Sequence, residues 1–315
     1  MNRKAIIFGI KGYKLSKIER SFLRKTKPWG IILFSRNVKN IFQLKKLTND
    51  IKSIFNQKNY PILMDVEGGK VSRLNKIIDL SIYSQSYFEK LYLKDKKLFL
   101  SYYKVYIDSV SNILKSTGIN INAAPVLDIR RKNAHKIIGS RSFSVYTKNV
   151  LKLGNICINF YKKNKIANII KHIPGHGLSK SDSHYRTPVI KAKKSELIKK
   201  DFVPFKFCKS AFAMTAHVIY KMYDPINTAT HSKIIINKII RKYIKFKGVL
   251  ISDDISMKSL KFSLEENAIK ALKAGCNLVL HCNGNIKEMI KIAKVVPKID
   301  KFTEKKTSDF YNFLG

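Results

Sequence analysis

The sequence predicts an α/β fold, a single (β/α)8 TIM-type barrel, on three observations. Eight short apolar runs recur along the 315 residues. They lack the strict alternation of a half-exposed strand, which is typical of parallel strands buried on both faces. The segments between them are long enough for crossover helices, and no Pro-, Gly- or Ser-rich linker divides the chain. One domain over residues 1–315 is therefore expected.

The predicted strands are spaced along the whole chain. They cover residues 5–10, 30–35, 61–66, 118–126, 166–172, 212–218, 248–254 and 277–283. Helical spacing is clear from Ile156 to Lys165 and from Glu265 to Gly275, where the glycine is a typical helix stop. The Lys-rich end, about 296–315, is expected to form either a closing helix or a frayed tail.

The composition excludes several classes of protein. A hydrophobic content of 45% excludes a disordered chain, and no apolar run approaches the ~18–20 residues of a membrane helix. The formal charge is +41, from 62 Lys+Arg and 21 Asp+Glu. These bases are scattered and accompany many Ile, Asn, Phe and Tyr residues, a combination that AT-rich codons favour. We therefore expect no specific nucleic-acid partner and no membrane insertion.

The amino terminus and the cysteines bear on location. The basic start at Asn2 is followed by an apolar run that stops at Lys11, and no small-residue cleavage site follows. The four cysteines show no CxxC spacing and are too few for a disulfide scaffold. A cytoplasmic protein with reduced thiols is expected.

Ionisable residues stand at the carboxyl end of nearly every predicted strand, where the active site of such a barrel lies. The strand-end residues are Asp65, Glu67, Asp128, Lys171, His172, His217, Asp253, Asp254 and His281. Taken singly, any of them could be an exposed loop residue or a satisfied ion pair. Together they predict a polar site at the carboxyl ends of the strands.

The segment 171–184, KHIPGHGLSKSDSH, concentrates three of the seven histidines and one acid. Asp182 stands two residues before His184, close enough on a turned loop to hold one imidazole nitrogen while the other faces a substrate. That pair suits a proton shuttle working near neutral pH.

A metal site is the competing use of this segment. The HxxxH spacing of His172 and His176 would suit a metal ion on a helix. Pro174 and Gly175 lie between them and disfavour a helix. We therefore expect no metal.

Two further segments carry candidate site residues. In SDDISM, successive side chains alternate, and Asp253 is expected to point into the barrel mouth. Its carboxylate could be a nucleophile, a metal ligand or a hydrogen-bond acceptor, and the residues alone do not decide. MDVEGGKVSR, from Met64 to Arg73, combines acids, bases and a double glycine, with Arg141 and Lys171 as further donors. That mixture suits a polyhydroxylated ligand.

From about residue 10 to residue 283, the chain contains sequence blocks that resemble those of a known family and occur in the same order. The blocks GIILFSRNV, MDVEGGKVSR, NAAPVLDI, IGSRSF, KHIPGHG…DSH, MTAHVIY, SDDISM and AGCNLVL carry the resemblance. They are similar to the β-N-acetylhexosaminidases of glycoside hydrolase family 3, particularly the compact single-domain enzymes of peptidoglycan recycling. The KHxPGHG…DSH block is the most specific of them.

The resemblance implies a role for each matching residue. Asp253 would be the nucleophile, and His184, supported by Asp182, would be the acid/base. The residues implied to bind the terminal N-acetylglucosamine are Asp65, Arg73, Arg141, Lys171 and His172. No metal or organic cofactor is implied, and the expected partner is a small glycan bound by a monomer.

The implied reaction is retaining hydrolysis that removes terminal N-acetylglucosamine from anhydromuropeptides. Three alternatives stay open. A phosphorylase of the same fold would transfer the sugar to phosphate, which a strongly basic chain could hold. A Schiff-base aldolase would use Lys171, and a nucleic-acid-binding protein would use the scattered bases.

Overall fold

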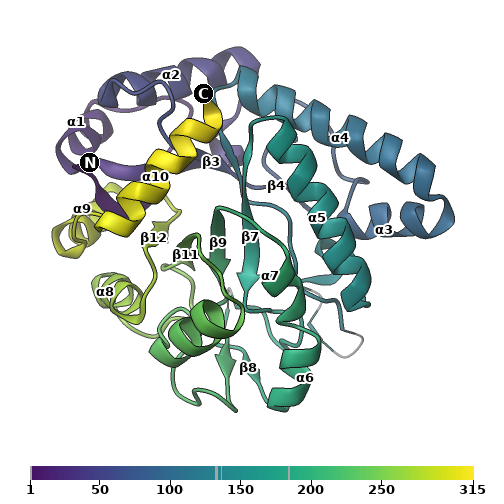
Figure 1. The fold of residues 1–315 in the computed structure, drawn as a ribbon. Helices are drawn as coiled ribbons and strands as arrows, with labels where there is room; N and C mark the ends of the chain where they lie inside the picture. The colour runs from purple at the N-terminus through teal and green to yellow at the C-terminus, as the bar shows by residue number, and fades with distance from the viewer. Residues whose placement is uncertain (1, 132–133, 136, 184) are drawn as a thin grey trace.

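The computed structural model describes residues 2–131, 134–135, 137–183 and 185–315. Its centre is a closed barrel of parallel strands in the order β1-β12-β11-β9-β7-β6-β3-β2 (Figure 1). The barrel strands are β1 (Lys4–Gly9), β2 (Pro28–Leu33), β3 (Ile62–Met64), β6 (Ile121–Asn122), β7 (Ala167–Ile173), β9 (Phe212–Thr215), β11 (Val249–Asp254) and β12 (Leu278–His281). Each lies in or overlaps one of the eight predicted runs, so the predicted barrel is confirmed.

Helices follow the strands and surround the barrel (Figure 1). They are α1 (Lys17–Thr26), α2 (Ile41–Phe55), α3 (Gln85–Lys94), α4 (Lys96–Ser116), α5 (Thr147–Lys163), α6 (Lys194–Lys199), α7 (Val203–Phe207), the π-helix η3 (Ile235–Tyr243), α8 (Leu264–Ala274), α9 (Ile286–Val295) and α10 (Lys301–Leu314), with short 3₁₀ turns η1 (Ser35–Asn37) and η2 (Gly139–Arg141). Ser263 and Glu266 form a capping box at the start of α8. Gly275 ends α8 with a φ of 119°, as its sequence position predicted.

Helix α10 closes the amino-terminal end of the barrel. The Trp29 indole Nε1 donates a hydrogen bond of 2.8 Å to Thr307 Oγ1 on α10. The rings of Phe212, at the start of β9, and Phe310 on α10 lie 5.5 Å apart. The sequence predicted either a closing helix or a frayed tail for the carboxyl-terminal segment, and the structure shows a closing helix. Figure 1 shows α10 in front of the barrel.

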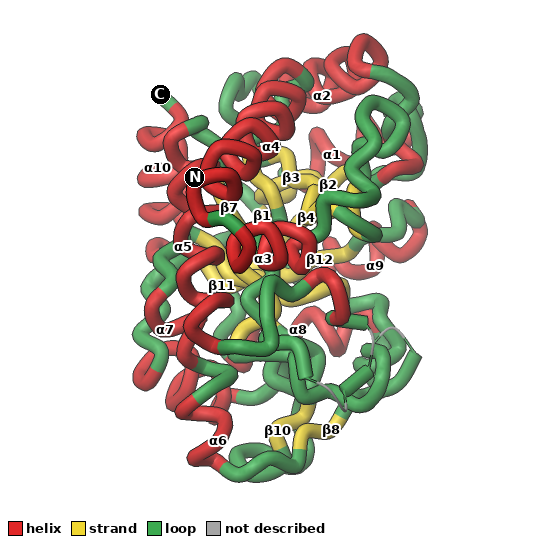
Figure 2. Tube along the Cα trace, turned by 90° about the vertical axis from the view of Figure 1, so that its right-hand side faces the viewer, coloured by secondary structure: helices red, strands yellow, loops and turns green. Residues whose placement is uncertain are grey.

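The long connections lie at the opposite end from α10. In Figure 2, α10 is at the left of the barrel, and long loops extend at the right and bottom, together with β8 (Val189–Ile190) and β10 (Ile219–Tyr220). An antiparallel hairpin of β4 (Val66–Gly68) and β5 (Val71–Ser72) follows β3 directly. Within the described residues, no helix has both the length and the apolar character needed to cross a membrane.

Candidate active site

A buried network of two acids and two bases occupies the carboxyl end of β3 and β7. Lys171 Nζ lies 2.8 Å from Asp65 Oδ1 and 2.6 Å from Glu67 Oε1. Arg141 makes a bidentate pair with Glu67, at 2.8 Å from Nε and 2.9 Å from Nη2. Arg73 Nη2 extends the network to Asp65 Oδ2 at 3.4 Å. Four of the predicted binding residues therefore meet in one cluster, joined by Glu67.

The double glycine after Glu67 shapes this network. Gly68 and Gly69 have φ values of 85° and 60°, a backbone region that other residues rarely adopt. A Cβ on Gly68 would lie 2.1 Å from the Tyr83 carbonyl oxygen. The tight hairpin lets the Arg73 amide donate to the Asp65 carbonyl at 3.1 Å. The turn therefore places the guanidinium of Arg73 back over Asp65.

The network keeps Lys171 charged. Burial alone would lower the pKa of its ammonium, but the carboxylates of Asp65 and Glu67 outweigh burial and raise that pKa. Arg141 and Lys171 in turn hold the pKa of Glu67 below its usual range, although burial opposes ionisation. An ammonium held this way is a poor amine nucleophile, which argues against the Schiff-base alternative.

Asp128 organises the first part of the histidine-rich segment. Its buried carboxylate lies 2.7 Å from His172 Nδ1 and accepts a hydrogen bond of 2.6 Å from the His176 amide. Among the described residues, no hydrogen bond engages the other ring nitrogen of His172, Nε2. Burial of Asp128 opposes ionisation, but His172 and His176 lower the pKa of the carboxyl. A carboxylate holding an imidazole in this way fixes the orientation of its ring.

Gly177 permits the close packing of this segment. A Cβ there would lie 1.9 Å from the Ile129 carbonyl oxygen, so the backbones of the two segments touch. The Tyr220 hydroxyl also donates to the Gly175 carbonyl. The loop after β7 is thus held by a close backbone contact and by a side-chain hydrogen bond, and it is not helical, as Pro174 and Gly175 predicted.

His176 is buried in a setting that disfavours its charged form. Burial, helped by the neighbouring His172, lowers its pKa from 6.5 to about 4. Its Nε2 lies 3.3 Å from Ser183 Oγ, and Nδ1 has no hydrogen-bond partner within the described part of the chain. A neutral imidazole therefore packs here under the loop.

We expect His176 to make the protein sensitive to acid. As the pH falls below 6.5, the unfolded chain binds a proton that the folded chain takes up only near pH 4, so stability is lost across this window. Between neutral pH and about pH 4.5, His176→Gln should lose about 2 kcal/mol less unfolding free energy than the unmodified protein. Urea denaturation at both pH values measures this, with the exposed His135→Gln as the matched control. An equal loss in all three proteins would contradict it.

The two acids at the end of β11 have different surroundings. Asp254 is held by its neighbours: its Oδ1 accepts from the Ser256 and Cys282 amides at 3.1 and 3.3 Å, and its Oδ2 accepts from Ser256 Oγ at 2.8 Å. Among the described residues, Asp253 accepts a hydrogen bond only from the Asp254 amide, at 2.8 Å. Asp253 is therefore the acid of the pair whose carboxylate has an oxygen available to contact a substrate.

Electrostatics favour an ionised Asp253. Burial opposes ionisation, but His217, His172, the Asp254 amide and Lys171 together hold the pKa of Asp253 below its usual range. His217 Nε2 lies 3.0 Å from the Asp254 carbonyl oxygen and therefore donates to it, while Nδ1 lies 2.7 Å from Thr230 Oγ1. This fixes the imidazole beside β11. The site thus contains an anionic carboxylate within the electrostatic reach of the binding cluster.

The predicted acid/base pair is described only in part. His184 lies outside the described residues. Asp182 is half-buried, and its carbonyl oxygen accepts from the Tyr185 and Arg186 amides, both at 3.2 Å. These turns place Asp182 in the loop that follows β7, the strand that carries His172.

Sequence reasoning left two important acids without a role. Glu67 and Asp128 stood out as strand-end residues, and the structure shows Glu67 linking Lys171 to Arg141 and Asp128 holding His172. His281, another strand-end residue, instead lies 2.9 Å from Glu288 on α9 and packs against Phe8. In the described ranges, no group of three or more His, Cys, Asp or Glu residues is arranged to hold a metal ion.

The fold and the site define an enzyme of the (β/α)8 class with its ionisable residues at the carboxyl ends of the strands. Residues 6–309 match the model of the glycosyl hydrolase family 3 N-terminal domain. The chain therefore belongs to glycosyl hydrolase family 3, and its relatives show that it is a glycoside hydrolase of the β-hexosaminidase type.

Individual relatives agree with this assignment. The chain is 32% identical to a β-hexosaminidase of Psychromonas ingrahamii over 286 residues, covering 89% of this chain and 83% of the relative. It is 32% identical to a β-hexosaminidase of Haemophilus influenzae, covering 89% and 79%. The crystal structure of NagZ from Neisseria gonorrhoeae in complex with N-trifluoroacetyl-D-glucosamine matches with a TM-score of 0.88 and 29% identity, covering 98% of this chain and 90% of that one.

Proposed function

We propose that this protein is a retaining exo-β-N-acetylglucosaminidase that removes terminal N-acetylglucosamine from peptidoglycan fragments. The observation that carries the proposal is the buried cluster around Lys171, beside the available carboxylate of Asp253. Alternating charges of this kind present both donors and acceptors to sugar hydroxyls. The similar Neisseria protein was crystallised with an N-acylated glucosamine, which supports an amino sugar as the ligand.

In the proposed binding mode, the cluster holds the terminal sugar. Asp65 and Glu67 keep Lys171 and Arg141 charged and in place. Asp65, Arg73, Arg141 and Lys171 offer hydrogen bonds to the hydroxyl groups. His172, oriented by Asp128, would offer its Nε2 to the same ring.

In the proposed first step, Asp253 attacks the anomeric carbon while His184, paired with Asp182, protonates the departing oxygen. The glycosidic bond breaks as the ester bond to Asp253 forms. In the second step, His184 takes a proton from water, which attacks the anomeric carbon and releases Asp253. Two displacements retain the anomeric configuration, and the transition states resemble an oxocarbenium ion.

A histidine acid/base has an electrostatic consequence. Most retaining enzymes use a second carboxylate for this task. The imidazole of His184 is neutral when it acts as a base and therefore adds no negative charge near Asp253. Hydrolysis by these side chains requires neither a metal ion nor an organic cofactor, so EDTA should leave the rate unchanged.

Selectivity for the 2-acetamido group tests the proposed substrate class. We expect the kcat/KM for 4-nitrophenyl β-N-acetylglucosaminide to exceed that for the β-glucoside by at least about a hundredfold. This ratio corresponds to a difference of roughly 2.7 kcal/mol in activation free energy. Nitrophenolate absorbance measures both rates. Similar rates would contradict an N-acetylglucosaminidase while leaving a glycoside hydrolase in place.

The acceptor separates a hydrolase from a phosphorylase. With added phosphate, the product of the proposed enzyme should remain free N-acetylglucosamine, and its rate of formation should not rise. Appearance of the sugar 1-phosphate would instead assign the phosphorylase reaction. The same assay on N-acetylglucosaminyl anhydromuramyl peptides tests the proposed natural substrate.

A further inference from the structure

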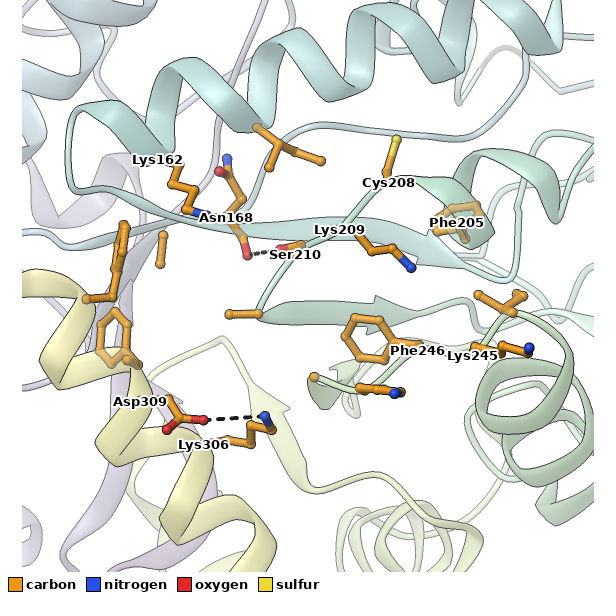
Figure 3. Close-up of a pocket in the computed structure, with 18 of the residues that line it drawn as sticks. Lys162, Asn168, Phe205, Cys208, Lys209, Ser210, Lys245, Phe246, Lys306 and Asp309 are labelled. Carbon is orange, nitrogen blue, oxygen red and sulfur yellow. Dashed lines mark hydrogen bonds and ion pairs between the residues drawn. The ribbon is translucent and has the colours of Figure 1, made fainter.

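A cavity lies at the end of the barrel opposite the candidate active site. It has a volume of about 670 Å³ and is lined by α5, the segments that precede β7, β9 and β11, and α10 (Figure 3). These segments mark the amino-terminal ends of the strands, whereas Asp65, Lys171 and Asp253 lie at the carboxyl ends. The cavity, which we call the basal cavity, is therefore separate from the glycosidase site.

The inner wall of the basal cavity is apolar. Its buried side chains include Ile158, Phe205, Cys208, Ile244, Phe246 and Phe310. Burial raises the pKa of the Cys208 thiol to about 12, so this group is uncharged near neutral pH. An apolar wall around an open volume favours a hydrocarbon ligand over water.

The inner polar groups of the cavity are already engaged. Asn168 Nδ2 donates to the Ala124 carbonyl at 2.8 Å, and Ser210 Oγ donates to the Asn168 carbonyl at 2.7 Å. These two donors are thus committed to the protein. A sugar or a nucleobase needs several hydrogen-bonding partners, and few are available in this cavity. A hydrocarbon chain needs no such partner.

The rim of the basal cavity is cationic. Six lysines and one acid line it: Lys162, Lys206, Lys209, Lys245, Lys247, Lys306 and Asp309. Asp309 is paired with Lys306 at 3.3 Å. Across the described residues, no carboxylate pairs with Lys162, Lys209, Lys245 or Lys247. Lys162, Lys209 and Lys306 surround the same space as Phe246 in Figure 3.

We propose that the basal cavity binds a long-chain fatty acid anion. The hydrocarbon chain would lie against the phenylalanines and isoleucines, and the carboxylate would meet the unpaired lysines at the rim. The volume is within the ~300–1,000 Å³ range of small-molecule sites. It suits one chain better than the two chains of a phospholipid.

Titration with a naturally fluorescent fatty acid, cis-parinaric acid, tests the proposal. We expect saturable binding at one site per protein, displaced by oleate but much less by oleyl alcohol, which lacks the charge. N-acetylglucosamine should not displace the probe, because the two sites lie at opposite ends of the barrel. Binding to phosphatidylglycerol vesicles without binding of oleate would overturn the proposal in favour of a lipid surface.

Matched variants separate the cavity from the general charge of the protein. The triple variant Lys209→Glu, Lys245→Glu, Lys247→Glu should weaken probe binding at least about tenfold. A control triple variant at the exposed Lys90, Lys94 and Lys97 changes the net charge equally and should bind within about twofold of the unmodified protein. Equal weakening in both would show that only net charge matters.

A cavity-filling variant tests the apolar part. Ala211→Trp places a large ring at the lining without removing a core side chain, since Ala211 is exposed. We expect it to abolish probe binding and to leave glycoside hydrolysis unchanged. The proposal of a fatty-acid site would be overturned if this variant bound the probe unchanged, or if the unmodified protein showed no saturable binding. Neither outcome would bear on the proposed glycosidase activity.

Discussion

Replacing Asp253 with alanine is expected to abolish turnover of every glycoside, however good its leaving group. In the proposed mechanism this carboxylate forms the bond to the sugar, so no substrate avoids the need for it. A loss of at least about 10⁴-fold in kcat is expected, the scale seen when a catalytic residue is removed. Initial rates with an aryl glycoside and with a natural disaccharide measure it, and both should fall together.

Asp254→Asn is the matched comparison for Asp253→Ala. Asp254 accepts hydrogen bonds from the Ser256 and Cys282 amides and from the Ser256 hydroxyl, so we assign it a structural role at the end of β11. An amide retains one acceptor oxygen, and the expected cost is about 1–2 kcal/mol of unfolding free energy with much of the activity kept. The reverse pattern, an active Asp253→Ala and an inactive Asp254→Asn, would exchange the two assignments.

The barrel could be predicted because its signal is local. Each of the eight strands lies in or overlaps a short apolar run whose residues are mostly buried, and such a run is visible without knowing its neighbours. The helix stop at Gly275 is likewise a local signal. The π-helical winding of residues 235–243 had no comparable signal, because the sequence there shows ordinary helical spacing of isoleucines.

The candidate site could be predicted only as a set of residues. Strand ends of a barrel converge, so Asp65, Lys171 and Asp253 could be grouped from their positions alone. Which of them pair could not, because the partners are far apart in sequence. Glu67 and Arg141 are separated by 74 positions, and their bidentate contact depends on the hairpin and η2 both being in place.

The choice between Asp253 and Asp254 shows the same limit. Alternation along a strand says that the two side chains point to different sides, but it does not say what each side contains. The Ser256 turn and the Cys282 amide of the neighbouring strand end supply that information. Likewise, Asp128 follows β6 and holds His172 on the neighbouring strand β7, so this strand-end acid supports a predicted binding residue.

The second large effect expected is that His184→Ala loses far more rate on a natural disaccharide than on an activated aryl glycoside. The histidine would protonate the departing oxygen, and a nitrophenolate hardly needs that proton. Removing one acid/base group typically costs about 10²–10⁴-fold where the proton matters. Comparing kcat/KM of the two substrates in the variant and in the unmodified protein measures the difference. Equal losses on both would contradict His184 as the proton shuttle.

The same substitution should slow the second step, because water must then attack without a base. The glycosyl-enzyme on Asp253 would accumulate with an activated substrate and appear as a burst of nitrophenolate followed by slow turnover. Intact-protein mass after a brief reaction should show one added sugar, and peptide mapping should place it on Asp253. Asp182→Asn should give a milder version, since the imidazole remains but loses its carboxylate. Because Asp254 is held by the Ser256 and Cys282 amides, a sugar found on Asp254 would require that network to open, and it would refute the assigned nucleophile.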